Sequence, residues 1–72
     1  MPRPRLLVRS VVFYCGYRLE PLAIEDGTYA CRVVGPGDRE LITLPYFQSA
    51  GAALVQGQSW LRDYLAQEGY GT

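Results

Sequence analysis

The stretch QSAGAALVQGQSWLRDYLAQE, residues 48–68, decides how the rest of this 72-residue chain is interpreted. Its apolar and small residues recur at spacings of three and four, which is typical of one face of an amphipathic helix. That face consists of Ala50, Ala53, Leu54, Gly57, Leu61, Tyr64 and Leu65. The pattern predicts a single helix over residues 48–68, lying across a sheet made by the residues before it.

Two residues indicate how this helix begins and how it packs. Ser49 is a candidate N-cap, because its hydroxyl can accept a hydrogen bond from a free amide of the first turn. Gly57 lies on the apolar face, although glycine inside a helix costs about 1 kcal/mol relative to alanine. We therefore expect the helix and the sheet to approach closely at Gly57.

Four segments upstream of the helix are rich in β-branched and aromatic residues and are separated by turn residues. They predict strands over residues 6–14, 17–24, 28–34 and 40–45, after a mobile tail at residues 1–5. Asp26 and Gly27 indicate a hairpin, and Gly16 a tight turn or bulge. Pro21 indicates an edge or bulge position, because proline cannot donate to a ladder, and Pro45 should end the last strand. The expected fold is a single α+β domain, a three- or four-stranded antiparallel meander sheet with one C-terminal helix packed across one face.

The composition argues against catalysis and against metal or cofactor binding. The chain has no histidine, so general acid–base chemistry lacks its most common group, and zinc sites built from Cys and His are excluded within one chain. Cys31 lies in a predicted strand and is expected to be a small core residue. No secretory signal pattern and no run of about 20 apolar residues is present, so we expect a cytoplasmic protein with free thiols and no membrane contact.

The apolar content favours binding. Hydrophobic residues make up 49% of the chain, yet a domain of this size buries only about 60% of its unfolded surface. Residues 6–14 are apolar on both faces of the predicted strand, which is the first candidate for a subunit interface. The favoured function is a small interaction or regulatory module, either a homodimer or a binder of another protein. Its candidate partner-binding residues are Val11, Phe13, Trp60 and Tyr64.

A second hypothesis is a surface for single-stranded nucleic acid. Small sheets bind single strands with aromatic and arginine side chains. The candidate residues are Arg9, Arg18 and Arg32, together with the sheet tyrosines Tyr14, Tyr17 and Tyr29. The acidic second half of the chain opposes this hypothesis, because it would repel phosphate groups.

Three segments also carry resemblances: YCGYRLEP, DGTYACRV and FQSAGAALVQGQSWL, which span residues 14–61 with gaps. In this order they resemble a set of small uncharacterised proteobacterial proteins, and that resemblance implies no activity. The layout is similar to the compact β-β-β-α domain of HicB-type antitoxins, which bind a toxin ribonuclease. The Pro-Gly-Cys stretch usual in that family before the helix is missing here, and there is no room for a DNA-binding extension. An antitoxin-like or phage-derived inhibitor is therefore a third hypothesis.

Overall fold

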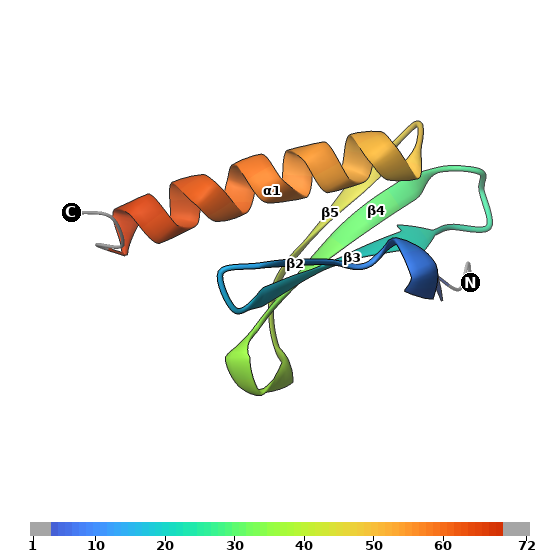
Figure 1. Cartoon of the computed structure of the whole chain (residues 1–72). Helices are drawn as coiled ribbons and strands as arrows, with labels where there is room; N and C mark the ends of the chain where they lie inside the picture. Colours follow the sequence, from blue (N-terminus) through green and yellow to red (C-terminus); the bar gives the residue numbers. More distant parts are fainter. Residues whose placement is uncertain (1–3, 69–72) are drawn as a thin grey trace.

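The computed structural model describes residues 4–68, which form one antiparallel sheet with one long helix across it (Figure 1). The strands and the helix are β1 (Arg5–Leu6), β2 (Val12–Tyr14), β3 (Tyr17–Ala23), β4 (Tyr29–Gly35), β5 (Arg39–Phe47) and α1 (Ala50–Gln67). Two short 3₁₀ turns, η1 (Val8–Ser10) and η2 (Pro36–Asp38), lie between them. The α+β class and the helix on one face are confirmed, with five strands in the sheet.

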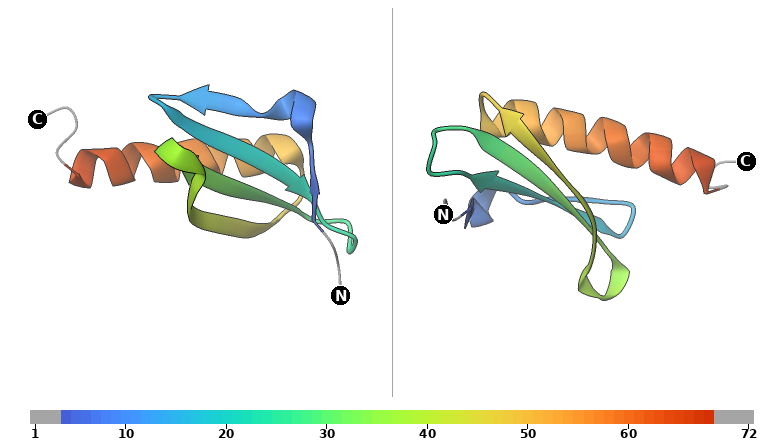
Figure 2. Two further views of the ribbon diagram at one scale, coloured as in Figure 1. Left: turned by 90° about the horizontal axis from the view of Figure 1, so that it is seen from below. Right: turned by 180° about the vertical axis from the view of Figure 1, so that it is seen from behind.

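The strands β1 and β2 lie one after the other along the same edge of β3, and β4 and then β5 follow on its other side. The helix packs on β3, β4 and β5, and no helix covers the other face of the sheet among the described residues (Figure 2). Residues 1–3 of the predicted tail lie outside the described residues. Arg5, which was also assigned to that tail, already pairs with Ala23 in β1.

The helix follows the predicted pattern. Ser49 caps it, with the Ser49 hydroxyl accepting a hydrogen bond from the amide of Ala52 at 3.1 Å. The residues that face the sheet recur at every fourth position, and they are Ala53, Gly57, Leu61 and Leu65. The core beneath them is completed by Leu19, Cys31 and Val33 from the two central strands. Both the N-cap and the apolar face are therefore confirmed.

The close approach predicted at Gly57 is also confirmed. A Cβ atom added to Gly57 would overlap Sγ of Cys31 and would lie 3.3 Å from Cys31 Cβ. Cys31 is fully buried, and this burial raises the pKa of its thiol to about 11. The thiol therefore stays protonated at neutral pH, as a core residue should.

The single strand predicted over residues 6–14 is wrong. The chain there forms β1, leaves the sheet through η1 and returns as β2. Pro21 explains the interruption. Its carbonyl accepts a hydrogen bond from the amide of Leu7 at 2.9 Å, so its nitrogen, which carries no hydrogen, faces the same side. The ladder cannot continue past Pro21 on that side, and residues 8–10 turn outward instead.

The last strand also differs from the prediction, because β5 continues through Pro45 to Phe47. An edge strand tolerates proline where the missing N–H would point to solvent. The register shifts by one residue between the pairs Tyr29–Phe47 and Cys31–Leu44, which marks a β-bulge. Tyr46 lies in this bulge with a φ of 71°, a conformation that non-glycine residues seldom adopt.

The β2–β3 connection is a two-residue hairpin turn, Cys15-Gly16, in which both residues have positive φ (52° and 83°). These values match a type I′ turn, whose preferred sequence is Asn-Gly.

The hairpin between β3 and β4 is stabilised by the side chain of Asp26. Its carboxylate accepts hydrogen bonds from the amide of Thr28 at 2.9 Å and from the hydroxyl of Thr28 at 2.6 Å. The hairpin predicted at Asp26-Gly27 is thereby confirmed.

We expect Cys15→Asn to stabilise the domain by about 0.5–1 kcal/mol, because asparagine adopts positive φ more readily than cysteine. Urea unfolding followed by circular dichroism would measure the change. The matched control is Cys15→Val, which places a β-branched residue in the same conformation and should destabilise the domain. Equal stability of the three proteins would contradict the type I′ geometry.

Candidate interaction surface

The strand β2 forms an open edge of the sheet, and this strand and its turn carry no charged residues. Residues 11–16, which include β2 and its turn, contain no Arg, Asp or Glu. Phe13 is the most exposed member of β2, with 75% of its surface accessible. In a two-residue hairpin the residues flanking the turn form a hydrogen-bonded pair, here Tyr14 and Tyr17. The next residue, Phe13, therefore turns its N–H and C=O groups away from β3 and toward the open edge.

The opposite edge, formed by β5, has several features that block strand pairing. Arg39 and Glu40 place exposed charges at its start. Pro45 removes one backbone donor, and the bulge at Tyr46 twists the strand at its end. Charges, prolines and bulges are the usual means by which proteins prevent edge-to-edge association. The two edges of this sheet thus differ in their capacity to accept another strand.

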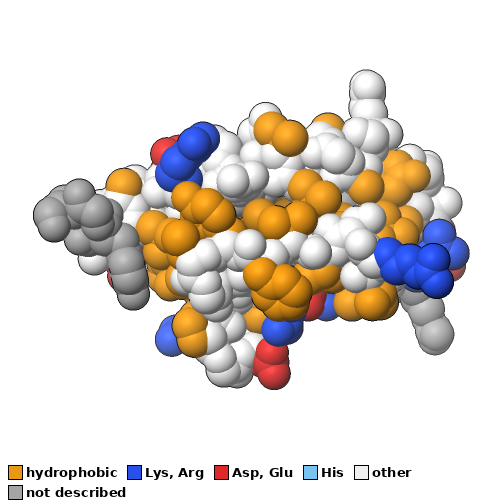
Figure 3. All heavy atoms as spheres, in the orientation of Figure 1, with side chains coloured by type: hydrophobic (Ala, Val, Ile, Leu, Met, Phe, Trp, Pro, Cys, Tyr) orange, Lys and Arg blue, Asp and Glu red, His pale blue; other side chains and the backbone are white. Residues whose placement is uncertain are grey.

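An aromatic strip lies beside the β2 edge on the face that carries the helix. It consists of Val12, Tyr14, Tyr17, Trp60 and Tyr64. Trp60 stacks on Tyr64 with ring centroids 5.2 Å apart, and Tyr64 and Tyr17 form a T-shaped pair with ring centroids 6.4 Å apart. Val12 and Tyr14 are the cross-strand partners of Leu19 and Tyr17, which places them on the same face. Figure 3 shows hydrophobic side chains gathered between α1 and β2, where this strip lies.

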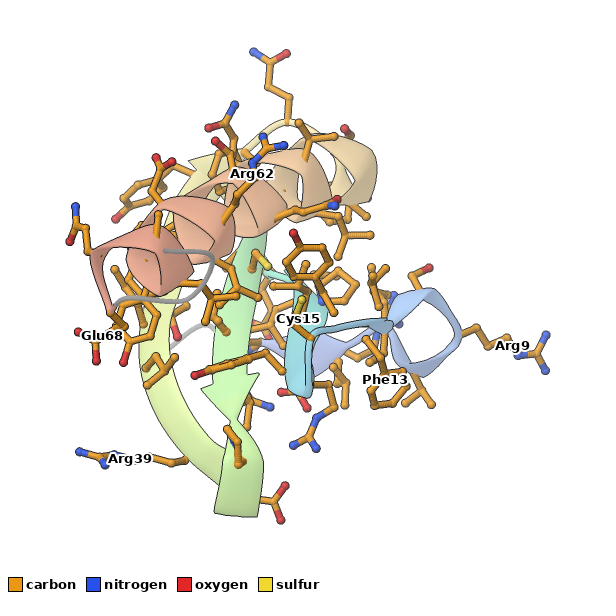
Figure 4. The ribbon with its side chains drawn as sticks, turned by 60° about the vertical axis from the view of Figure 1, so that its left-hand side comes forward. Arg9, Phe13, Cys15, Arg39, Arg62 and Glu68 are labelled. Carbon is orange, nitrogen blue, oxygen red and sulfur yellow. The ribbon has the colours of Figure 1, made fainter. Side chains whose placement is uncertain are left out.

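The four predicted partner-binding residues lie on two faces of the sheet. Trp60 and Tyr64 are half-buried members of the aromatic strip. Phe13 lies on the opposite face, because its cross-strand partner is Arg18 and not a core residue, and Figure 4 shows its ring pointing away from the helix. Val11 precedes β2 and is half-buried. The structure therefore brings together Trp60 with Tyr64, and separates this pair from Phe13.

The face opposite the helix carries a buried carboxylate between two arginines. Glu20 is only 5% exposed. Its two carboxylate oxygens accept hydrogen bonds from Nε of Arg18 and Nε of Arg32, each at 2.6 Å, and Arg18 also binds Asp38 at 2.9 Å. Burial acts to raise the pKa of Glu20, but the hydrogen bonds and charges of the two arginines outweigh it and hold that pKa below its ordinary value.

These ion pairs determine what the predicted nucleic-acid residues can do. Arg18 and Arg32 do lie together, but they are held by Glu20, and Asp38 and Glu40 line the same hollow. Arg9 is exposed in η1 and points away from the body of the molecule (Figure 4). The three arginines therefore do not form one surface, and acidic side chains offset the charge of two of them.

Two contributors to these surfaces were missed by sequence reasoning. The burial of Glu20 between Arg18 and Arg32 was not predicted from the sequence. Val12 and Tyr14 were assigned to a long strand, without a link to Tyr17 or the helix. The tight turn at Cys15-Gly16 was the available signal, because it makes Tyr14 and Tyr17 neighbours across two strands.

Comparison of the chain with protein-family models, with curated proteins and with solved structures finds no match. The resemblances stated from the sequence therefore stay predictions. Within residues 4–68, no group of three His, Cys, Asp or Glu side chains could hold a metal ion. The helix of this part of the chain is not apolar enough over a sufficient length to cross a membrane. The candidate functional site is therefore the surface around β2.

Proposed function

We propose that this chain is a small protein-interaction module that binds a polypeptide strand along the open edge of β2. The observation that carries the proposal is the contrast between the two edges of the sheet. The β5 edge has charges, a proline and a bulge, whereas the β2 edge is uncharged and exposes Phe13. Strand addition uses free backbone groups for affinity and side-chain contacts for specificity.

The surroundings of β2 define the kind of strand that would fit. On the helix side the added strand would contact Val12 and Tyr14 and the neighbouring aromatic strip. On the other side it would contact Phe13. Both sets of contacts are apolar or aromatic, so the proposed ligand is an extended, uncharged segment with apolar side chains on both faces. An antitoxin-like or phage-derived inhibitor would be one example of such a module.

A random-peptide display selection against the immobilised chain tests this function. We expect enrichment of uncharged, alternating apolar and aromatic sequences, whose affinities can be measured by fluorescence anisotropy. Phe13→Pro removes both the outward N–H and the exposed ring without removing a bond to β3, so it should weaken peptide binding by about tenfold or more. Thermal unfolding would verify that this variant remains folded.

The matched control is Tyr46→Ser, which removes a similarly exposed aromatic ring, 79% accessible, from the β5 edge. This variant should bind the selected peptides as the unmodified chain does. Binding that survives Phe13→Pro, or a selection that enriches nothing over the Phe13→Pro protein, would contradict the proposal. A labelled single-stranded oligonucleotide at low salt provides the comparison with the nucleic-acid hypothesis, and we expect no salt-dependent binding because Glu20 holds Arg18 and Arg32.

A further inference from the structure

We propose that the strand added to β2 is β2 of a second copy of this chain, antiparallel to the first and related to it by a two-fold axis at Phe13. This inference rests on the proposed function and identifies its partner. The result would be a continuous sheet through two copies, with both helices on the same face. The backbone, the side chains and the charge of β2 each favour this pairing.

The backbone of β2 is complementary to itself. Phe13 turns its N–H and C=O groups outward, as its place next to the hydrogen-bonded pair Tyr14–Tyr17 requires. With the axis at Phe13, each Phe13 N–H can donate to the Phe13 carbonyl of the other copy. Such a reciprocal pair is the hydrogen-bonded arrangement of an antiparallel ladder, and a two-fold axis generates it without any change of register.

The side chains of β2 match under the same symmetry. Phe13 would face Phe13 of the second copy on the side away from the helix. On the helix side, Val12 would face Tyr14 of the second copy, and the reverse contact would form at the same time. These are aromatic and β-branched cross-strand pairs, which stabilise antiparallel sheets. The pairing would also cover Phe13, one of the most exposed large apolar side chains of the described chain.

A second copy fits better than an unrelated strand because few strands have the side-chain pattern that the β2 edge requires. The ligand must be uncharged and apolar on both faces, and within residues 4–68 the free edge strand with that pattern is β2 itself. The β5 edge begins with exposed Arg39 and Glu40, so it could not supply the same partner. The formal net charge of the chain is zero, so two copies would not repel each other strongly.

Sedimentation equilibrium over micromolar to millimolar concentrations tests the dimer. The unmodified chain should approach twice the 8.1 kDa mass of a single chain. Phe13→Lys and Phe13→Glu should each be monomeric, because the axis places like charges opposite each other. An equimolar mixture of the two variants should recover the dimeric mass, since only a two-fold axis at residue 13 brings Lys opposite Glu.

The register has an independent readout in Cys15, which is exposed, whereas Cys31 is buried and should not react. A spin label on Cys15 would lie four residues along the strand from its counterpart, so the backbone separation should be roughly 14 Å. The amide of Phe13 should also exchange more slowly with solvent as the protein concentration rises. These two measurements distinguish pairing at β2 from association through another surface.

The outcomes separate this inference from the proposed function. A chain that remains monomeric at millimolar concentration, or variants that dimerise as the unmodified chain does, would overturn the second copy as the partner. Peptides that still bind the monomer and require Phe13 would leave the proposed function intact. Selected peptides that dissociate the dimer would support both, because the peptide and the second copy would then compete for one edge.

Discussion

Gly57→Val should destabilise the domain by about 3–4 kcal/mol, which is a large fraction of its total stability. The new Cβ would overlap Sγ of Cys31, which is fully buried under α1. A 72-residue domain has a total stability of roughly 4–10 kcal/mol. Urea unfolding followed by circular dichroism would measure the loss.

The control for this prediction is Gly51→Ala, in the first turn of the same helix. A Cβ at Gly51 would meet only the Ser49 hydroxyl, at 3.9 Å, which is an ordinary contact. This change should therefore stabilise the domain by up to about 1 kcal/mol, the helix preference of alanine over glycine. The two glycine substitutions thus have opposite expected signs, and destabilisation of similar size in both would contradict the close packing of Gly57 on β4.

A double-mutant cycle identifies the atom responsible. Gly57→Ala alone should be destabilising, whereas Gly57→Ala in the background of Cys31→Ala should cost less, because the overlapping sulfur is gone. Cys31→Ala alone should cost about 1–2 kcal/mol, since it leaves a small cavity in the core. Additive effects of the two changes would mean that another contact limits the approach of helix and sheet.

Glu20→Gln should destabilise the domain by about 2 kcal/mol at pH 7. The carboxylate is almost completely buried and accepts one hydrogen bond from each of two arginines. A neutral amide would remove the counter-charge that both arginines share, although Arg18 would keep its ion pair with Asp38. The arginines are themselves about one-third exposed, which limits the loss. Chemical unfolding at pH 7 would measure the difference, with Glu25→Gln in the exposed turn as a control that should change stability by less than about 0.5 kcal/mol.

The pH dependence of this effect has a definite sign. The pKa of Glu20 is lower in the folded protein than its ordinary value of 4.5, so the unfolded chain binds the proton more readily. The stabilisation by Glu20 is therefore fully present above pH 4.5 and is lost as the pH falls through the folded-state pKa. The difference in stability between the unmodified chain and Glu20→Gln should narrow in acid. A difference that does not change between pH 7 and pH 3 would show that Glu20 does not act through its charge.

The candidate surface was only partly predictable from the sequence. Phe13 and Trp60 were identifiable because large apolar residues lay on a two-sided strand and beside a helical stripe. The sequence could not place them on opposite faces, since that depends on the hairpin register at Cys15-Gly16. Arg18 and Arg32 could be assigned to one face, but their engagement with Glu20 requires two strands to pair in one particular register.

The sequence by itself determined the helix and its inward face, the Ser49 cap, the Asp26 hairpin and the antiparallel order of the main strands. These features depend on local preferences and on periodicity, which are properties of neighbouring residues. Only the tertiary structure decided that η1 interrupts the strand predicted over residues 6–14 and that Glu20 is buried. It also decided that β2 is an open edge, whereas the β5 edge has charges, a proline and a bulge. Each of these depends on which strand lies next to which, because Pro21 disrupts a ladder only where another strand lies along that side.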